Sequence, residues 1–186
     1  MQFSNTKSSY GMIAIFFHWA SAAFVIGLFA SGLWMTSLNY YSPWYHTAPR
    51  YHKAVGLIFA ALILGRLSWK ALSSSPAPIG SSFEKAVATF VHWLLYLLLV
   101  ALFGSGYLIA TAGGKSIPIF GLFEFQALFE AKGSEIIAGK VHFYAAWSLV
   151  IMVSLHATAA LKHHFMNKDD VLKRMLGWSQ RKTGEA

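Results

Sequence analysis

Two histidines in the last long apolar segment of the chain are the first candidates for chemistry. His142 and His156 are fourteen positions apart. Because an α-helix turns by about 100° per residue, this spacing brings both rings to nearly the same helix face, about 21 Å apart along the axis. Imidazole is a common metal ligand, and a membrane core about 30 Å thick has room for one ring near each side. The pattern predicts two metal centres stacked across a membrane, each needing a second ligand.

The composition favours a membrane protein. Of 186 residues, 56% are hydrophobic and 12% are charged, and the mean hydropathy is +0.49. A soluble domain has about 25% charged residues, roughly twice this share. The length suits one domain, residues 1–186, made of a small bundle of spanning helices. The absence of cysteine excludes disulfides, iron–sulfur clusters and thioether-linked haem, and leaves histidine as the main soft ligand.

Four apolar segments must position these histidines, and they predict an all-α, integral membrane four-helix bundle. The expected helices cover about residues 11–36, 52–72, 84–111 and 140–166. The first segment is too long for a secretory signal and lacks a small-residue cleavage site, so it is expected to be retained. Its Gly27 and Gly32 would let another helix or a flat ring approach closely.

The connections between these helices have distinct compositions. Residues 38–51 form an aromatic and proline-rich loop that is typical of an interfacial belt, and residues 73–82 form a polar loop. Residues 113–139 are predicted to contain a short helix lying on the membrane surface, and residues 167–186 a polar tail.

The basic residues predict the orientation. Ten of the fifteen lie on the side of the two termini, and five lie on the side of the 38–51 and 113–139 loops. By the positive-inside rule, both termini are cytoplasmic. The inner group is Lys7, Arg66, Lys70, Lys85, Lys162, Lys168, Lys173, Arg174, Arg181 and Lys182. Since the net charge of +8 is explained by this topology, nucleic acid is not an expected partner.

The topology assigns a depth to each intramembrane histidine. His18 and His156 fall near the inner side, and His52 and His142 fall near the outer side. Ionisable residues within a membrane are candidates for function by default. A single such histidine could equally be an interfacial or hydrogen-bonded side chain, but four histidines that match in depth by pairs predict ligation by two imidazoles at each site.

The number of ligands per site distinguishes between metals. Structural zinc usually takes four protein ligands in one place, whereas this pattern offers two and two. Haem iron accepts two axial imidazoles, because the porphyrin supplies the other four nitrogens. Iron that is ligated in this way has no open position, so its chemistry is electron transfer.

Several stretches of the chain resemble the bacterial cytochrome b561 family of small four-helix dihaem membrane proteins. They are FFHWA with His18, YHKAVG with His52 followed by GRL with Arg66, VHWLLYLLL with His92, and residues 141–175. The last stretch is the most specific, with two histidines fourteen positions apart, a double histidine and the pattern K-D-[ND]-x-L-x-R-M. The resemblance covers nearly the whole chain.

The resemblance implies a cofactor set, a location and an activity. It implies that two haem b groups are ligated by His18, His52, His142 and His156, in agreement with the depths. It places the protein in the bacterial inner membrane as a multi-pass protein. Relatives oxidise superoxide at the outer face and reduce ubiquinone, so a superoxide:ubiquinone oxidoreductase is expected, with lipid, quinone and superoxide or a redox protein as partners.

Two further histidines are candidates for contacts near the inner side. His92 could compete with His18 as a ligand. The resemblance gives His92 no ligand role, so a polar contact near the inner haem or a quinone is expected. His163 lies seven positions after His156 on nearly the same face. The resemblance suggests a quinone contact there, and a solvated helix end is the alternative.

Three basic residues are candidates for contacts with haem propionates. Arg66 follows His52 by fourteen positions and would share its helix face near the inner haem. Arg50 or Lys53 would serve the outer haem. Charge-assisted hydrogen bonds to the propionates would suit each of them. The alternative is a charge that only sets the topology.

Other functions remain open from the sequence. The chain could be the cytochrome b subunit that links a partner dehydrogenase or hydrogenase to the quinone pool, a non-redox structural bundle, or a transporter. The segments show no clear inverted repeat and few intramembrane acids, against a transporter. The connector SSSPAPIGSS and Phe103 depart from the resembled family, which leaves the electron acceptor open.

Overall fold

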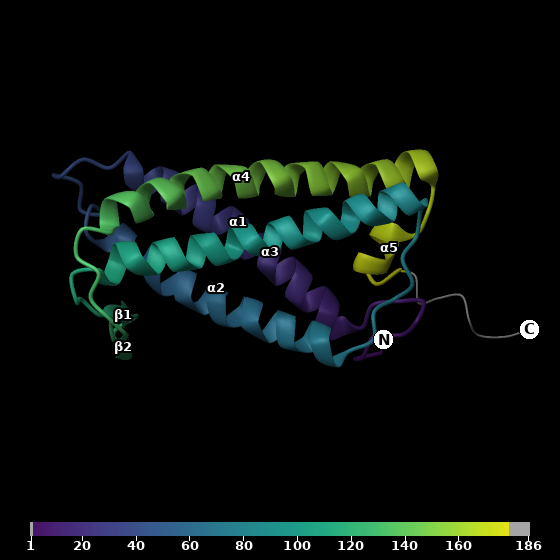
Figure 1. Cartoon of the computed structure of the whole chain (residues 1–186), viewed down its shortest axis with the longest axis horizontal. Helices are drawn as coiled ribbons and strands as arrows, with labels where there is room; N and C mark the ends of the chain where they lie inside the picture. The colour runs from purple at the N-terminus through teal and green to yellow at the C-terminus, as the bar shows by residue number, and fades with distance from the viewer. Residues whose placement is uncertain (1, 179–186) are drawn as a thin grey trace, which may run out of the picture. The chain divides into compact units, whose positions relative to one another are not determined.

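The structure, a computed structural model, describes residues 2–178, and most of them are helical (Figure 1). The four long helices are α1 (Met12–Thr36), α2 (Thr47–Leu72), α3 (Ser82–Thr111) and α4 (Glu135–Lys162). A π-helical turn, His163–Asn167, continues α4 and is followed by the short helix α5 (Val171–Met175). Two short strands, β1 (Ile117–Ile119) and β2 (Phe123–Phe125), lie between α3 and α4.

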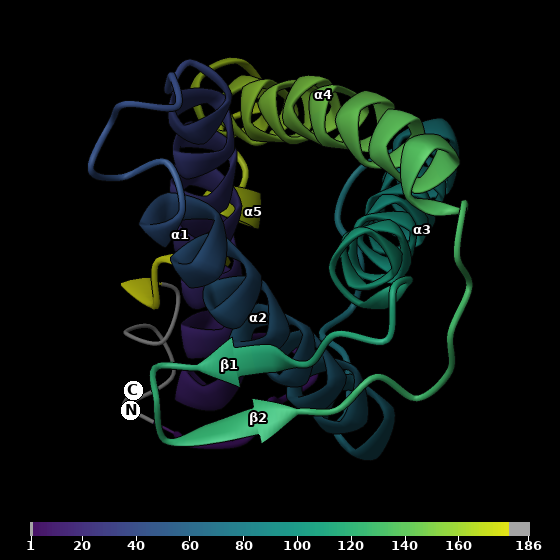
Figure 2. The ribbon, with the colours of Figure 1, turned by 90° about the vertical axis from the view of Figure 1, so that its left-hand side faces the viewer.

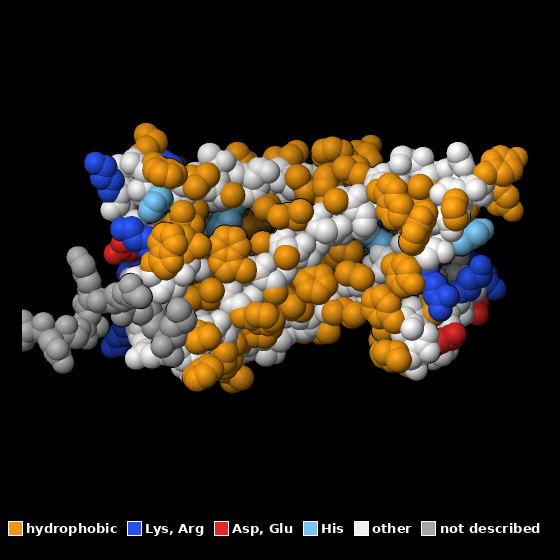
Figure 3. Space-filling view, turned by 180° about the vertical axis from the view of Figure 1, so that it is seen from behind, with side chains coloured by type: hydrophobic (Ala, Val, Ile, Leu, Met, Phe, Trp, Pro, Cys, Tyr) orange, Lys and Arg blue, Asp and Glu red, His pale blue; other side chains and the backbone are white. Residues whose placement is uncertain are grey.

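All four long helices have the length and composition of membrane spans. Their outward side chains are apolar, and large ones such as Phe16, Trp93 and Tyr144 are 64%, 73% and 68% exposed. Hydrophobic side chains are spread over the visible face, whereas Lys and Arg side chains of residues 2–178 are absent from its middle (Figure 3). An apolar surface of this extent indicates a lipid environment.

The chain divides into two compact units, and each long helix contributes a segment to both. The terminal unit comprises Met1–Ala22, Leu62–Leu94 and Ile151–Ala186, and the central unit comprises Ala23–Ala61 and Leu95–Val150. That residues 1–186 form a single domain stays a prediction. Arg181 and Lys182, which were counted with the inner basic residues, lie outside the described residues.

The prediction of four long apolar helices is confirmed, but two of them begin earlier than expected. α2 begins at Thr47 rather than near residue 52, and α4 begins at Glu135 rather than near residue 140. Pro49 hid the start of α2, yet proline is tolerated in a first turn because the N–H it lacks has no partner within the helix. Glu135 suits a first turn, where a carboxylate faces the positive end of the helix dipole.

The predicted surface helix in the connection 113–139 is wrong, because this segment forms a β-hairpin (Figure 2). β1 and β2 pair antiparallel, with Ile117 opposite Phe125 and Ile119 opposite Phe123. Phe120 and Gly121 have φ values of 50° and 77°, and Leu122 N–H donates to Ile119 O at 2.9 Å. Two consecutive residues with positive φ give the tight turn that suits a hairpin.

The hairpin is held by a small apolar cluster of the central unit. Ile117 and Ile119 are buried against Ala54 of α2 and Ala110 of α3. Tyr107 of α3 packs on the same cluster, and its hydroxyl accepts a hydrogen bond from Leu128 N–H at 2.7 Å. The connection is therefore fixed against the ends of α2 and α3 that carry the functional candidates of this unit.

In the terminal unit, a capping box starts α3 at the end of the 73–82 connection. Ser81 N–H donates to Glu84 Oε2 at 2.9 Å, and Glu84 N–H donates to Ser81 Oγ at 3.3 Å. This reciprocal pair satisfies two N–H groups at the helix start.

The expected polar tail is not irregular throughout, because it contains α5. Trp19 of α1 donates from Nε1 to Met175 O at 2.9 Å, and Arg174 donates from Nη1 to Ala77 O at 2.7 Å. These two bonds tie α5 to α1 and to the connection before α3. The tail therefore packs in the terminal unit as far as α5.

Candidate functional site

In the central unit, the structure brings His52 of α2 and His142 of α4 together. Their ring centres are 6.3 Å apart, and the ring planes are inclined by 73°. A metal ion between two opposed imidazoles holds the ring centres about 6.4 Å apart, given a metal–nitrogen bond of about 2.0 Å and about 1.2 Å from each nitrogen to its ring centre. The observed spacing suits one metal ion between the two rings.

A serine on α1 orients the His52 ring. Ser31 Oγ lies 3.0 Å from His52 Nδ1 and donates its own proton to Leu28 O at 3.0 Å. With the hydroxyl proton given to the carbonyl, the oxygen is free to accept from the Nδ1–H tautomer. The Nε2 atom of His52 then carries the free lone pair that a metal ligand needs.

A serine on α3 makes the matching contact to His142. Ser105 Oγ lies 3.1 Å from His142 Nδ1 and donates to Ala101 O at 2.6 Å. Leu102 O is a second acceptor, 3.2 Å from the same Nδ1. Our sequence analysis missed both serines. The available signal was the dipeptide Ser-Gly, which occurs once in each of these apolar segments, at 31–32 and 105–106.

In the terminal unit, His156 of α4 lies beside two other histidines. The ring centre of His18 is 6.3 Å away, the same spacing as in the central unit. The ring centre of His92 is 5.3 Å from that of His156, about 1 Å shorter than two imidazoles on one metal require. The spacing therefore favours His18 over His92 as the partner of His156.

The remaining metal ligands must come from outside these pairs. Within residues 2–178, the His, Cys, Asp and Glu side chains form no group of three or more that could hold a metal ion. Each pair offers two imidazoles, and no third side chain of these four types joins them as a metal ligand among residues 2–178. A porphyrin supplies four ligands in one plane and leaves two axial positions for the imidazoles.

Arg66 of α2 is half-buried beside the terminal-unit pair. Its Nη2 lies 3.4 Å from His18 Nδ1, and its Nη1 lies 3.4 Å from Phe17 O, which are both long contacts. Because a guanidinium has only donors, the contact with His18 requires an unprotonated Nδ1. A metal on Nε2 would put the proton on Nδ1 and leave Arg66 to bind an anion. Among residues 2–178, no carboxylate forms an ion pair with it.

Arg50 and Lys53 line an open pocket of about 470 Å³ in the central unit. His46 and Tyr45 line the same pocket, and our sequence analysis had not selected His46. The pocket lies at the first turns of α2, where the positive end of the helix dipole adds to the two cations. The site has the electrostatic character of an anion-binding site.

A second pocket of the central unit adjoins His52. It has a volume of about 460 Å³ and is lined mainly by apolar groups, together with Gly27 and Ser31 of α1. The tryptophans Trp34 and Trp44 also line it. A cavity of this size and polarity suits an apolar ligand, although His142 does not line it.

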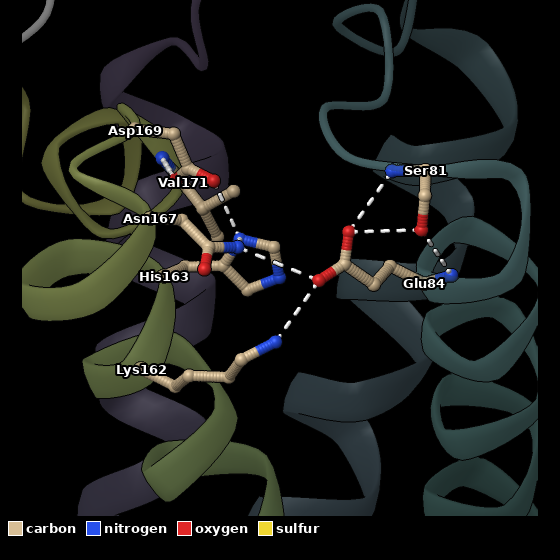
Figure 4. Close-up of polar contacts among 7 residues, drawn as sticks. All are labelled: Ser81, Glu84, Lys162, His163, Asn167, Asp169 and Val171. Atoms are coloured by element: carbon tan, nitrogen blue, oxygen red, sulfur yellow. Dashed lines mark hydrogen bonds and ion pairs between the residues drawn. The ribbon is translucent and has the colours of Figure 1, made fainter.

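His163 begins the π-helical turn at the end of α4 (Figure 4). Its Nδ1 lies 2.5 Å from Asp169 Oδ2, and the two side chains are only 14% and 18% exposed. Asp169 Oδ1 also accepts a hydrogen bond from Val171 N–H at 3.1 Å. Asp169 therefore fixes the imidazole and leaves its Nε2 for another molecule. Single-turn π-helices are frequent at functional sites.

Glu84 of α3 links to this histidine through Asn167, beside Lys162 (Figure 4). Glu84 Oε1 accepts from Lys162 Nζ at 3.1 Å and from Asn167 Nδ2 at 3.4 Å. Asn167 Nδ2 also lies 3.2 Å from His163 Nδ1. The start of α3 is thereby linked to the end of α4, and the histidine lies in a polar setting at a helix end.

Comparison with known proteins gives one consistent result. The sequence profile described as prokaryotic cytochrome b561 matches residues 9–178. The chain is 47% identical over 182 residues to Cytochrome b561 homolog 2 of Escherichia coli (strain K12), which covers 96% of this chain and 97% of that protein. It is 30% identical over 173 residues to a protein of Yersinia pestis named Probable superoxide oxidase CybB, with 90% and 95% covered. Cytochrome b561 homolog 1 of Escherichia coli is 28% identical over 166 residues.

Proposed function

Because the chain belongs to the prokaryotic cytochrome b561 family, a family of membrane electron-transfer proteins, we propose that it carries electrons from superoxide at the outer face to ubiquinone in the membrane. Two superoxide ions would each lose one electron and become dioxygen. One quinone would take up both electrons and two protons. The name of the Yersinia pestis relative supports the donor, and the equal spacing of the two histidine pairs is the observation that carries the proposal.

Each histidine pair would hold one haem b through its Nε2 atoms. The central unit contributes His52 and His142, and the terminal unit contributes His18 and His156. The ring spacing of 6.3 Å in both pairs supports this ligand set. When bound, haem b supplies a one-electron couple, and iron with two imidazoles has no open position for oxygen chemistry. The shorter spacing of His92 supports a contact outside the ligand set.

The basic residues would serve anions at both sites. Arg66, with two long contacts, would turn to a propionate of the haem in the terminal unit. Arg50 and Lys53 would bind a propionate in the central unit or attract superoxide, since both lie in the same pocket. A positive potential at an exposed site raises the association rate of a small anion.

His163 would bind the quinone. Its Nδ1 would donate to the Asp169 carboxylate, and in the doubly protonated ring Nε2 would donate a hydrogen bond to a quinone oxygen and deliver that proton. The polar side chains at the end of α4 would let protons from the aqueous side reach His163.

We also propose an orientation in the bacterial inner membrane with both termini cytoplasmic. The excess of basic residues beside the termini supports it. A reporter enzyme that is active only in the periplasm, fused to the C-terminus, should give no signal. The same reporter inserted at residue 41, in the loop between α1 and α2, should be active. A reversed result would exchange the inner and outer roles.

The proposed activity can be tested optically on the purified, oxidised protein. Superoxide should promptly reduce the haem, as seen in the haem absorbance spectrum. Added ubiquinone should then reoxidise the haem. Superoxide dismutase in the mixture is the control and should abolish the reduction. We expect Arg50→Gln with Lys53→Gln to slow the reduction about tenfold, an effect that high salt should diminish.

A different outcome would favour the alternative function as a cytochrome b subunit. If the haems stay oxidised with superoxide and are reduced by dithionite, the cytochrome stands and the donor is another redox protein. The chain would then act as the cytochrome b subunit of a dehydrogenase or hydrogenase. A protein with no haem absorbance would contradict both readings.

A further inference from the structure

We propose that the two Ser-Gly dipeptides, Ser31–Gly32 of α1 and Ser105–Gly106 of α3, position the histidine pair of the central unit and lower the reduction potential of the haem held there. This inference rests on the proposed function. It assigns a role to four residues of helices that carry no ligand of this pair.

The serine of each dipeptide sets the tautomer of one imidazole. Both hydroxyls donate to a carbonyl of their own helix, Ser31 to Leu28 O and Ser105 to Ala101 O. Each oxygen is then left as an acceptor for a histidine Nδ1–H, at 3.0 Å from His52 and 3.1 Å from His142. A proton held on Nδ1 keeps Nε2 unprotonated and ready for iron.

The glycine of each dipeptide lies next to the imidazole ring of one histidine. A Cβ atom on Gly106 would lie 3.1 Å from Cε1 and 3.4 Å from Nδ1 of His142. A Cβ atom on Gly32 would lie 3.5 Å from Cε1 of His52, which is an ordinary van der Waals contact. The space is therefore tighter at Gly106 than at Gly32, which gives the two positions different expected sensitivities.

The same arrangement occurs twice, on different helices and for both members of one pair. A chance serine would satisfy its hydroxyl within its own helix and touch nothing else. The buried Ser21 of α1 donates to Phe17 O of its own helix. In the terminal unit, the group near His18 Nδ1 is the guanidinium of Arg66, which has no acceptor. The serine acceptors therefore distinguish the two pairs chemically.

A hydrogen bond from Nδ1–H to an acceptor makes the imidazole a more basic ligand. A more basic ligand stabilises ferric iron relative to ferrous iron, so it lowers the reduction potential. The haem of the central unit would then be the better electron donor of the two. The serines would favour electron flow from the central pair to the terminal pair.

Redox titration of Ser31→Ala and Ser105→Ala in the full-length protein tests the serines. We expect two haems per chain in each variant. In both variants, the same haem should show a ratio of reduced to oxidised form that is about 3- to 10-fold higher than in the wild-type protein at the same applied potential. A tenfold rise corresponds to about 59 mV for one electron. Ser21→Ala is the matched control and should leave both components unchanged. Shifts no larger than that of the control would overturn the role of the serines.

Haem content tests the glycines separately. Gly106→Ala should have a lower haem content per chain than Gly32→Ala. The ratio of haem to protein and the low-spin ferric signal in electron paramagnetic resonance measure this content. Gly104→Ala is the control on α3, because a Cβ atom there meets nothing within 4 Å. Full haem content in Gly106→Ala with an unchanged signal would overturn the glycine role.

These measurements separate the inference from the proposed function. A wild-type protein with two haems and no effect of the serine variants would reject the inference and leave the cytochrome function intact. A wild-type protein without haem would reject the function itself.

Discussion

The replacement His156→Ala is expected to leave one haem per chain, against the two proposed for the wild-type protein. The variant would lack one of the two imidazoles proposed to hold the cofactor of the terminal unit. The central-unit pair, His52 and His142, keeps its own contacts in this variant. The ratio of haem to protein in the purified protein measures the loss, and the dithionite-reduced spectrum identifies the component that remains.

His92→Ala is the matched control for this experiment. His92 is the other histidine beside His156, with ring centres 5.3 Å apart, and its loss should leave two haems in place. If His92→Ala removed one haem and His18→Ala did not, then His92 would be the ligand. Two intact haems in His156→Ala would reject the assignment of His156.

The loss should also change the electron transfer. In His156→Ala, superoxide should still reduce the haem of the central unit, while reoxidation by ubiquinone should slow at least about 100-fold. The reason is that the terminal unit, which carries the proposed quinone contact His163, would lack its cofactor. Stopped-flow absorbance distinguishes the two phases. Unchanged reoxidation would show that the quinone receives electrons at another site.

Much of the fold could be predicted because spanning helices have a strong and simple signal. Twenty or more apolar residues in sequence predict a spanning helix, and the depth of a residue follows from its distance to the helix end. Depth matched His52 with His142 and placed His18 and His92 as alternatives for His156, and in the structure His18 and His52 each lie beside the matched histidine.

Other features depend on information that depth does not contain. The hairpin between α3 and α4 follows from positive φ angles at Phe120 and Gly121, and the apolar composition of the segment hid the alternation of its side chains. The approach of His92 to His156 depends on how each helix is rotated about its axis, which periodicity defines poorly when all faces are apolar. The serines beside the central-unit pair were missed because a serine in an apolar helix usually bonds its own backbone, and the rotation that turns it toward a histidine is not visible in the sequence.

The residues that follow α4 form more local structure than their polar composition predicts. The pattern K-D-D after the double histidine looked like a polar tail. In the structure, Lys168 has a φ of 55° and ends the π-helical turn, and Asp169 folds back onto His163. Asp170 lies at the start of α5 and pairs with Lys173 at 3.0 Å. The motif therefore builds the surroundings of His163.

The replacement His163→Ala is accordingly expected to lower the rate of ubiquinone reduction about 100-fold or more, while both haems stay bound and are still reduced by superoxide. Loss of a positioned acid typically lowers a rate by about 10²- to 10⁴-fold. Asp169→Asn should have a smaller effect, about tenfold, because the imidazole remains but loses its charged partner. His164→Ala is the matched control next in sequence. Equal effects of His163→Ala and His164→Ala would instead indicate a general disturbance of the helix end, and a normal rate in His163→Ala would remove this histidine from the quinone site.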